Sequence, residues 1–261
     1  NVNGNTTNGG GLTEALRINT AGKVGIGTAA PLNLLQIGSS YPITMNGSYP
    51  DIHFNAYYSA PSYRTVTTGF GGRLTFNAST GKLTMSTGAS STTAGSNYSP
   101  VEVFGISAAG IVTTPLQPNF LARIPSGSVA ITSNGWATFN FNSTALGWDK
   151  GGNFTSSTKR FTAPVAGVYF FQWLIQVESI TDAPTWYYAY PTVNGSGSFG
   201  TTNGMSAADQ VEPVGAYHAL KGTQSLQLAA NDYVEMRYYW DNGNGNLKGG
   251  GESMWAGHLI G

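Results

Sequence analysis

Apolar and polar residues alternate in short runs along the chain, with the two-residue period of β-strands. The runs at 167–177 and 232–240 show this alternation most fully. Clusters of Gly, Ser, Thr, Asn and Pro, which favour turns, separate the runs. From residue 113 onward the apolar stripe of a long helix is missing, apart from a weak short run near Ala207. The pattern therefore predicts an all-β protein.

The strand spacing divides the first part of the chain into two segments and a linker. Residues 1–31 hold two strands, at 15–18 and 23–26, that are too short to bury their own apolar side chains. We therefore expect an intertwined, fibre-like segment formed with copies of the same chain. Residues 32–112 predict a small β-rich domain, and residues 113–118, with two prolines, predict a linker. The strands expected in the small domain are 34–37, 52–57, 74–77, 82–86, 101–106 and 110–112.

Residues 119–261 predict a head domain built as a jelly-roll β-sandwich, because many short strands joined by polar loops are typical of that fold. In a jelly roll the first and last strands lie side by side and antiparallel. The end of the chain is therefore expected near Asn119, where the head begins. The expected strands are 119–124, 129–131, 137–141, 152–156, 167–177, 186–193, 214–220, 225–228, 232–240 and 253–260.

Composition excludes several classes of function for this chain of 261 residues. Only 9% of residues are charged, 12 basic against 12 acidic, so no basic stripe is available to hold nucleic acid. The absence of cysteine excludes disulfides and thiol catalysis. No apolar run is long enough to span a membrane, so no membrane insertion is expected. The chain begins with Asn1, not Met, and is expected to be the C-terminal part of a longer protein.

Residues 25–30, Gly-Ile-Gly-Thr-Ala-Ala, match the spacing of a dinucleotide-binding fingerprint. That motif works only when a helix N-terminus follows to receive the pyrophosphate, and here Pro31 follows without a helical pattern. No cofactor is therefore expected.

Titratable residues show no catalytic spacing. The twelve carboxylates are scattered and are expected mainly at solvated loop ends and turns. His53, His218 and His258 are far apart, so each is expected to be a structural histidine with its hydrogen bonds satisfied. Asp209 and Glu212 could ligate calcium from one loop, but the spacing of a calcium loop is missing, so a metal site stays open. We expect a protein that is not an enzyme.

Two aromatic clusters, at 186–190 and 238–240, have two interpretations. Aromatic faces suit the apolar faces of pyranose rings, so the clusters could form a platform for sugars. Alternate residues of a strand face the core, however, so at least half of these rings are expected to be packing residues.

Strand direction in a jelly roll predicts where a ligand binds. The loop 241–252 and the loop 179–184 are expected together at the distal end of the head, with the loop 195–213 toward the base or flank. The distal loop is rich in Asn and Gly, and its amides suit hydroxyl-rich ligands. Its glycines are equally typical of a tight flexible turn. The expected ligand contacts are Asp182, Asp241, Asn242, Asn244, Asn246 and Lys248.

The head resembles the complement C1q and tumour-necrosis-factor-like family in three stretches. Residues 161–171, Phe-Thr-Ala-Pro-Val-Ala-Gly-Val-Tyr-Phe-Phe, resemble the family signature almost position for position. The stretches 225–234 and 256–260 are similar to its later strands. Asn231 stands where the family usually has Gly, and Trp255-Ala256 stands where it has Phe. The resemblance implies a jelly roll, a homotrimer, and recognition instead of catalysis.

Residues 22–28, Gly-Lys-Val-Gly-Ile-Gly-Thr, with Pro31 and Leu34 after them, resemble an element of bacteriophage tail fibres and related bacterial fibre-like proteins. This resemblance implies the distal part of a virion tail fibre, joined to the rest of the fibre through its N-terminus. The expected function is attachment of a virus to a host surface receptor, such as polysaccharide or lipopolysaccharide. A bacterial surface or matrix adhesin is the first alternative. A fibre-borne polysaccharide depolymerase is the second, although no solenoid period is present.

Overall fold

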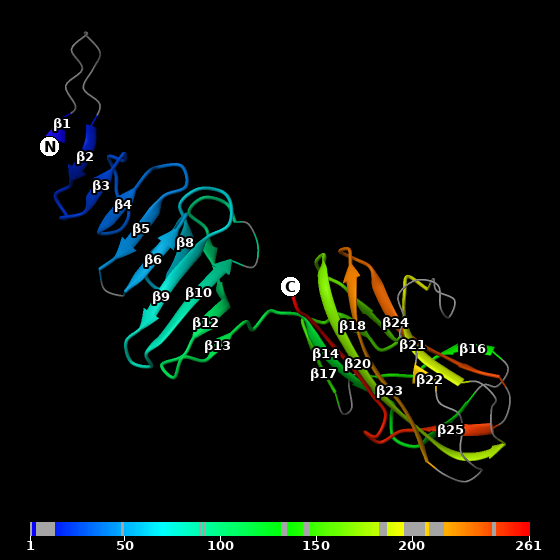
Figure 1. Ribbon diagram of the computed structural model, residues 1–261. Helices are drawn as coiled ribbons and strands as arrows, with labels where there is room; N and C mark the ends of the chain where they lie inside the picture. The colour runs from blue at the N-terminus through cyan, green and yellow to red at the C-terminus, as the bar shows by residue number, and fades with distance from the viewer. Residues whose placement is uncertain are drawn as a thin grey trace. The chain divides into compact units, whose positions relative to one another are not determined.

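The computed structural model describes residues 2–3, 14–47, 50–88, 90, 92–131, 135–142, 147–182, 187–195, 207–208, 217–241 and 244–261. Every regular element within these residues is a β-strand, so the expected all-β class is confirmed. The chain divides into two compact units, Asn1–Leu116 and Gln117–Gly261 (Figure 1). The division falls inside residues 113–118, the segment expected to be a linker.

A ten-stranded sheet forms most of the first unit, in the order β1-β2-β3-β4-β5-β6-β9-β10-β12-β13. Neighbouring strands are antiparallel except β3 and β4, which are parallel and flank residue 31. The fibre-like segment expected at 1–31 and the domain expected at 32–112 therefore share one sheet. The strands are β1 (Val2–Asn3), β2 (Glu14–Ile18), β3 (Val24–Ile26), β4 (Leu35–Ile37), β5 (Ile43–Asn46), β6 (Asp51–Phe54), β9 (Gly72–Asn77), β10 (Lys82–Gly88), β12 (Pro100–Ile106) and β13 (Val112–Thr113).

The two faces of this sheet differ in chemistry because side chains alternate along each strand. Cross-strand partners such as Ile43 and Phe54, or Leu74 and Met85, put apolar side chains together on one face. We call this the apolar face. The partners Thr44 and His53 lie on the opposite face, which we call the polar face.

A small three-stranded sheet packs on the polar face. It consists of β7 (Ala56–Ser59), β8 (Ser62–Thr65) and β11 (Asn97–Tyr98), in the order β11-β8-β7. The Thr44 hydroxyl donates a hydrogen bond of 2.6 Å to the Ala56 carbonyl, and the Tyr63 ring lies 5.7 Å from the His53 ring. The small sheet therefore buries the polar face.

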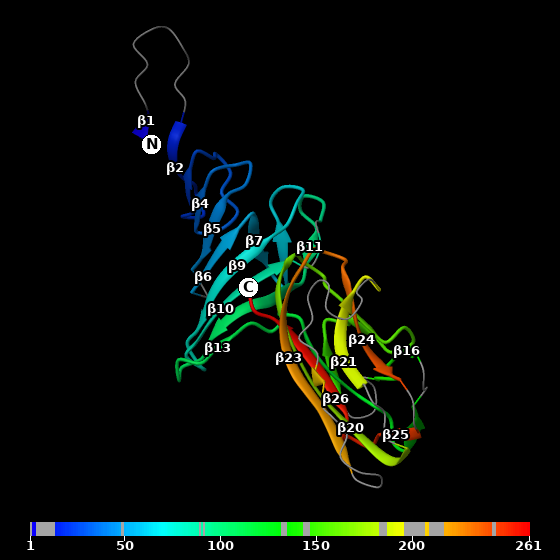
Figure 2. The same cartoon turned by 45° about the vertical axis from the view of Figure 1, so that its right-hand side comes forward.

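Two further sheets form the second unit, as Figures 1 and 2 show from two directions. The first has the order β15-β25-β20-β26-β14-β17, with β23 also paired to β20. The second has the order β18-β19-β24-β21-β22, with β16 paired to β24. The strands of the first are β14 (Asn119–Arg123), β15 (Ser128–Ala130), β17 (Trp148–Lys150), β20 (Gly167–Asp182), β23 (His218–Leu228), β25 (Asn244–Lys248) and β26 (Met254–Leu259). Those of the second are β16 (Gly135–Thr138), β18 (Phe154–Thr155), β19 (Arg160–Thr162), β21 (Tyr187–Val193), β22 (Ala207–Ala208) and β24 (Tyr233–Trp240).

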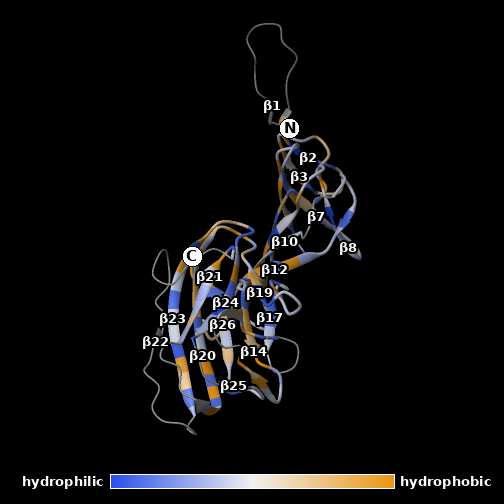
Figure 3. Cartoon of the chain, turned by 90° about the vertical axis from the view of Figure 1, so that its right-hand side faces the viewer, coloured by the Kyte–Doolittle hydropathy of each residue, from blue (hydrophilic) through white to orange (hydrophobic). Residues whose placement is uncertain are grey.

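Aromatic side chains from both sheets fill the core of the second unit. The Phe120 ring lies 4.9 Å from Phe161 and 4.8 Å from Trp255, measured between ring centroids. Apolar and polar residues alternate along β20, as the colours of Figure 3 show. Because of this alternation, the apolar side chains of each strand face a shared core between the two sheets, as a sandwich requires.

The first and last strands of this unit pair as expected. β14 and β26 are antiparallel neighbours, with Phe120 opposite Gly257. A Cβ atom on Gly257 would lie 2.6 Å from the Phe171 ring and 2.9 Å from the Phe120 ring. Glycine at this position therefore lets two core rings close over the last strand. The expected jelly-roll sandwich is confirmed.

Several strands differ from the expected ones. The strand expected at 167–177 continues to Asp182, and residues 218–220 of the strand expected at 214–220 join the strand expected at 225–228 in the single strand β23. Lys221, Gly222 and Thr223 continue the ladder opposite β20, with Gly222 facing Trp173. The expected loop 241–252 contains β25, because β20 and β15 both pair with that segment.

Candidate functional site

The structure brings together the two segments expected at the tip of the head. Asp182 at the end of β20 pairs with Asn244 at the start of β25, so residues far apart in sequence are strand partners. The register shifts between Glu178 and Asp182, where Ser179 has a positive φ of 55°. Such a β-bulge bends the strand and redirects its side chains. Residues 244–248 of the expected distal loop are therefore held by strand pairing and do not form a flexible turn.

Lys248 is engaged within the protein. Its Nζ lies 2.9 Å from Glu252 Oε2 and 3.9 Å from Glu178 Oε2, and it sits 4.4 Å above the centre of the Tyr217 ring. The Ser128 hydroxyl donates to the second carboxylate oxygen of Glu178. The hydrogen bond to Glu252 raises the pKa of Lys248 above its usual value. Two carboxylates thus offset this charge, which weakens the case for Lys248 as a ligand contact.

The other expected contacts are only partly described. Asn246 is half-buried in β25, opposite Glu178 on one side and Ala130 on the other. Asp241 is half-buried just after β24. Asp182 and Asn244 are placed by their backbone pairing alone, and Asn242 lies outside the described residues.

A second candidate surface lies on the outer side of the other sheet. We call it the aromatic face, formed by Trp136, Tyr188 and Tyr239, with the buried ring of Tyr190 beside Trp136. The centroid of the Trp136 ring is 5.4 Å from that of Tyr190, edge to face, and 4.8 Å from that of Tyr239. Tyr188 continues the row 6.2 Å beyond Tyr239. Trp136 is 40% exposed, so a ring face or edge is available to a ligand.

Polar groups border the aromatic face along β24. Arg237 lies opposite Tyr190 in the ladder, and Tyr239 lies opposite both Tyr188 and Trp136. Burial raises the pKa of the Tyr190 hydroxyl, and Arg237 partly opposes that rise. Rings with a guanidinium group at their edge suit a ligand that has both apolar faces and hydroxyls.

The structure separates the two interpretations of the aromatic clusters. Tyr187, Tyr190, Tyr238 and Trp240 are buried, whereas Tyr188 and Tyr239 are half-buried on the outer side. The prediction that at least half of the rings are packing residues is thus confirmed for the described residues. Sequence reasoning missed Trp136, which comes one residue before an expected strand. Only the pairing of β16 with β24 brings it beside the tyrosines.

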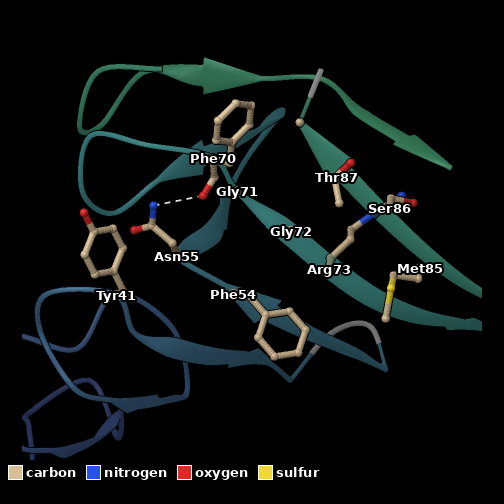
Figure 4. Close-up of a pocket in the computed structure, with 11 residues that line it drawn as sticks. Tyr41, Phe54, Asn55, Phe70, Gly71, Gly72, Arg73, Met85, Ser86 and Thr87 are labelled. Carbon is tan, nitrogen blue, oxygen red and sulfur yellow. Dashed lines mark hydrogen bonds between the residues drawn. The ribbon is translucent and has the colours of Figure 1, made fainter. Parts of the chain in front are cut away.

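The first unit has a hollow of about 530 Å³ on its apolar face (Figure 4). It lies where Gly72, which has no side chain, is flanked by its strand partners Phe54 and Thr87. Tyr41 and Phe70 are at its rim and are 74% and 61% exposed. The hollow can therefore accept an apolar side chain.

Asn55 shapes one wall of this hollow. Its φ is +50°, a conformation that asparagine tolerates better than most residues. Its amide donates to the carbonyls of Thr67 (3.2 Å) and Phe70 (3.0 Å), and its Oδ1 accepts from the Thr67 amide. These bonds fix the loop that carries Phe70.

Two expectations about titratable residues are wrong at the polar face. Asp51 is 3% exposed and is not at a solvated loop end, because the small sheet covers it. His53 is fully buried, yet neither ring nitrogen has a hydrogen-bond partner. Burial lowers the pKa of His53; Asp51 opposes this effect and Arg73 adds to it. Burial also raises the pKa of Tyr98 to about 12.

Metal ligands do not gather in the part of the chain that the structure describes: no group of three or more His, Asp or Glu side chains could hold an ion there. Asp209 and Glu212, the calcium candidates, lie outside that part, as does most of the loop expected at 195–213. No helix among the described residues is long and apolar enough to cross a bilayer.

Solved structures similar to this chain are C1q-like and tumour-necrosis-factor-like globular domains. The globular domain of zebrafish complement 1qA is 18% identical and covers 56% of this chain and 98% of its own, with a TM-score of 0.41. Murine APRIL at pH 8.0 is 10% identical, with 55% and 100% covered and a TM-score of 0.40. Eiger TNF from S. frugiperda is 12% identical, with 56% and 94% covered and a TM-score of 0.36. No protein-family model and no curated protein sequence matches the chain.

Proposed function

We propose that the chain is a homotrimeric attachment protein at the distal end of a viral fibre, whose head binds a hydroxyl-rich ligand on a host cell surface. The ligand class is polysaccharide or lipopolysaccharide, and the protein acts by binding without catalysis. It works outside the cell as part of the virion, and the rest of the fibre joins at its N-terminal side. The fibre setting is supported by the resemblance of residues 22–34 to tail-fibre elements.

The aromatic face carries this proposal. Trp136, Tyr188 and Tyr239 form a row of rings on the outer side of one sheet, and their spacing is set by strand pairing. Ring faces pack on the apolar faces of pyranoses, while the Arg237 guanidinium at the edge suits the sugar hydroxyls. Because the strands are rigid, little conformational entropy is lost when a ligand binds.

The tip of the head supports a second contact area for the same ligand. Asn246 on β25 lies opposite Glu178, whose carboxylate accepts a hydrogen bond from the Ser128 hydroxyl, and amide and carboxylate groups can form hydrogen bonds with sugar hydroxyls. A long polymer can occupy separate areas, and the combined avidity then exceeds that of either area alone.

Replacing Trp136 with alanine tests the proposal. A stacked ring contributes about 1.4 kcal/mol, so Trp136→Ala is expected to weaken binding roughly tenfold on an array of bacterial capsular polysaccharides and lipopolysaccharides. Trp148→Ala is the matched control, because Trp148 is 57% exposed but lies on β17 of the other sheet. Equal binding by Trp136→Ala and wild type would exclude the aromatic face. Release of oligosaccharide from the bound polymer would instead identify a depolymerase.

A further inference from the structure

The apolar face of the ten-stranded sheet lies open in the single chain. Nine of its side chains are between 39% and 63% exposed, which is unusual for large apolar residues spread over one surface. They come from eight strands of the sheet, of which β2 is the first and β13 the last. Cross-strand pairing places them next to one another across the sheet. These side chains are Ile18, Ile26, Ile37, Ile43, Met45, Phe54, Phe76, Met85 and Val112.

The polar face shows the opposite burial. Thr44 and His53 are fully buried, and Gln36 and Asp51 are each 3% exposed. Burying polar groups while apolar groups stay in water reverses the pattern that stabilises a monomeric sheet. The sheet therefore has its larger apolar surface on the side that the single chain leaves uncovered.

Charge is missing from the apolar face among the described strands from β3 to β13. Lys82 pairs with Asn77, Arg73 with His53, and Glu102 with Ser86. All six are polar-face positions, alternating with the apolar ones along their strands. A partner recognised by opposite charge therefore has nothing to pair with here.

The exposed apolar area is large enough for a stable interface. If each of the nine side chains offers about 200 Å² when fully exposed, they leave on the order of 800 Å² in water, which equals the area of about 800 Å² per partner in a standard interface. The face is also uneven: it has a hollow of about 530 Å³ at Gly72, and the rings of Tyr41 and Phe70 protrude at the rim of the hollow. Such an uneven surface allows side chains of two copies to interdigitate, as they do in well-packed interfaces.

We infer that the apolar face is the interface between copies of this chain, with the same face of each copy packed around a common symmetry axis. An uncharged apolar surface can pack on other copies of itself without charge repulsion, and a closed ring of copies buries that surface on every copy. Each copy would insert a side chain into the hollow of its neighbour. The inference rests on the homotrimer of the proposed function and names the surface that holds it, independently of any host ligand.

The native methionines provide a test that needs no substitution. Met45 and Met85 are 41% and 45% exposed in the single chain, whereas Met236 is fully buried in the head. Hydrogen peroxide oxidises accessible methionines. If copies cover the apolar face, Met45 and Met85 are expected to oxidise as slowly as Met236, and at least tenfold more slowly than in 6 M urea. Sedimentation should give about three times 27.4 kDa.

A pair of variants identifies the face directly. Met85→Glu puts a carboxylate on the apolar face, and Met45 is then expected to oxidise at least fivefold faster. Ala15→Glu adds the same charge at an exposed position of the polar face and is expected to leave Met45 protected. The fluorescence of the head should be native in both, since all six tryptophans follow residue 116.

Three results would overturn the inference. Rapid oxidation of Met45 and Met85 in a trimer would move the interface elsewhere and leave the proposed trimer standing. A monomer with both methionines protected would mean that the chain covers its own apolar face. A monomer with both oxidised would remove the trimer as well, while binding to polysaccharide would still be tested separately.

Discussion

Single residues on the polar face are held in an environment that opposes their charge. Asp51 Oδ2 lies 3.9 Å from His53 Nε2 and 3.8 Å from Arg73 Nη1, so the carboxylate is close to both the imidazole and the guanidinium. The carboxylate favours an imidazolium, but burial and the guanidinium oppose it, so the pKa of His53 is lowered. The neutral ring is thus the form that the folded first unit accepts.

This environment predicts acid sensitivity of the first unit. In the unfolded chain His53 takes up a proton near pH 6.5, whereas the folded form does so only at lower pH. The unfolded state therefore binds more protons, and the free energy of unfolding falls as pH drops below about 6.5. Urea titrations followed by circular dichroism at pH 7.5 and 5.5 measure the fall.

His53→Gln is expected to remove most of that decrease, since His53 is the one histidine among residues 1–116. Tryptophan fluorescence reports the head in the same samples. An undiminished fall in the variant would assign the effect to another group.

At the scale of elements, β20 and β23 form the longest ladder of the head, and glycine makes their close approach possible. A Cβ atom on Gly222 would lie 2.3 Å from Cζ2 of Trp173, and Trp173 is only 3% exposed. The indole therefore rests on the bare backbone of β23. Because Trp173 is enclosed by the core, it has little room to move away from a larger residue.

Gly222→Ala is expected to destabilise the head by about 2 to 3 kcal/mol through overpacking. Gly135→Ala is the control, because a Cβ atom on Gly135 in β16 meets nothing within 4 Å. The control should change stability by less than about 0.5 kcal/mol. Guanidinium unfolding followed by tryptophan fluorescence gives both values. Equal stability of the two variants would show that Trp173 can shift.

The same elements show what the sequence could predict. Two-residue alternation was sufficient for the β class and the jelly roll. It was insufficient for β23, since Gly222 with its polar neighbours is typical of a turn and only the contact with Trp173 shows its role. Residues 241–252 have a loop composition, but pairing with β20 and β15 holds Asn244–Lys248 extended. The aromatic face depends on the register between β16, β21 and β24, which local patterns do not contain.

At the scale of the whole molecule, the two units have separate sheets and separate cores. The buried apolar cluster of the head runs from Phe120 to Trp255 and draws on both of its sheets. The first unit instead buries polar groups between its sheets. A boundary between Leu116 and Gln117 therefore separates two kinds of packing.

A fragment of residues 117–261 is therefore expected to fold without the first unit. Its unfolding free energy, followed by tryptophan fluorescence, should match that of the head in the full chain within about 1 kcal/mol, because few contacts cross such boundaries. A fragment that is insoluble, or that loses the fluorescence spectrum of the full chain, would show that the head needs residues 1–116.

Because the apolar face points outward, the stability of the first unit also depends on protein concentration. If another molecule must cover that face, part of the free energy of folding is a free energy of association. The melting temperature of the first unit then rises with protein concentration, and each tenfold dilution removes about 1.4 kcal/mol per partner bound. A newly synthesised chain thus reaches its full stability only after it has associated with other copies of the chain.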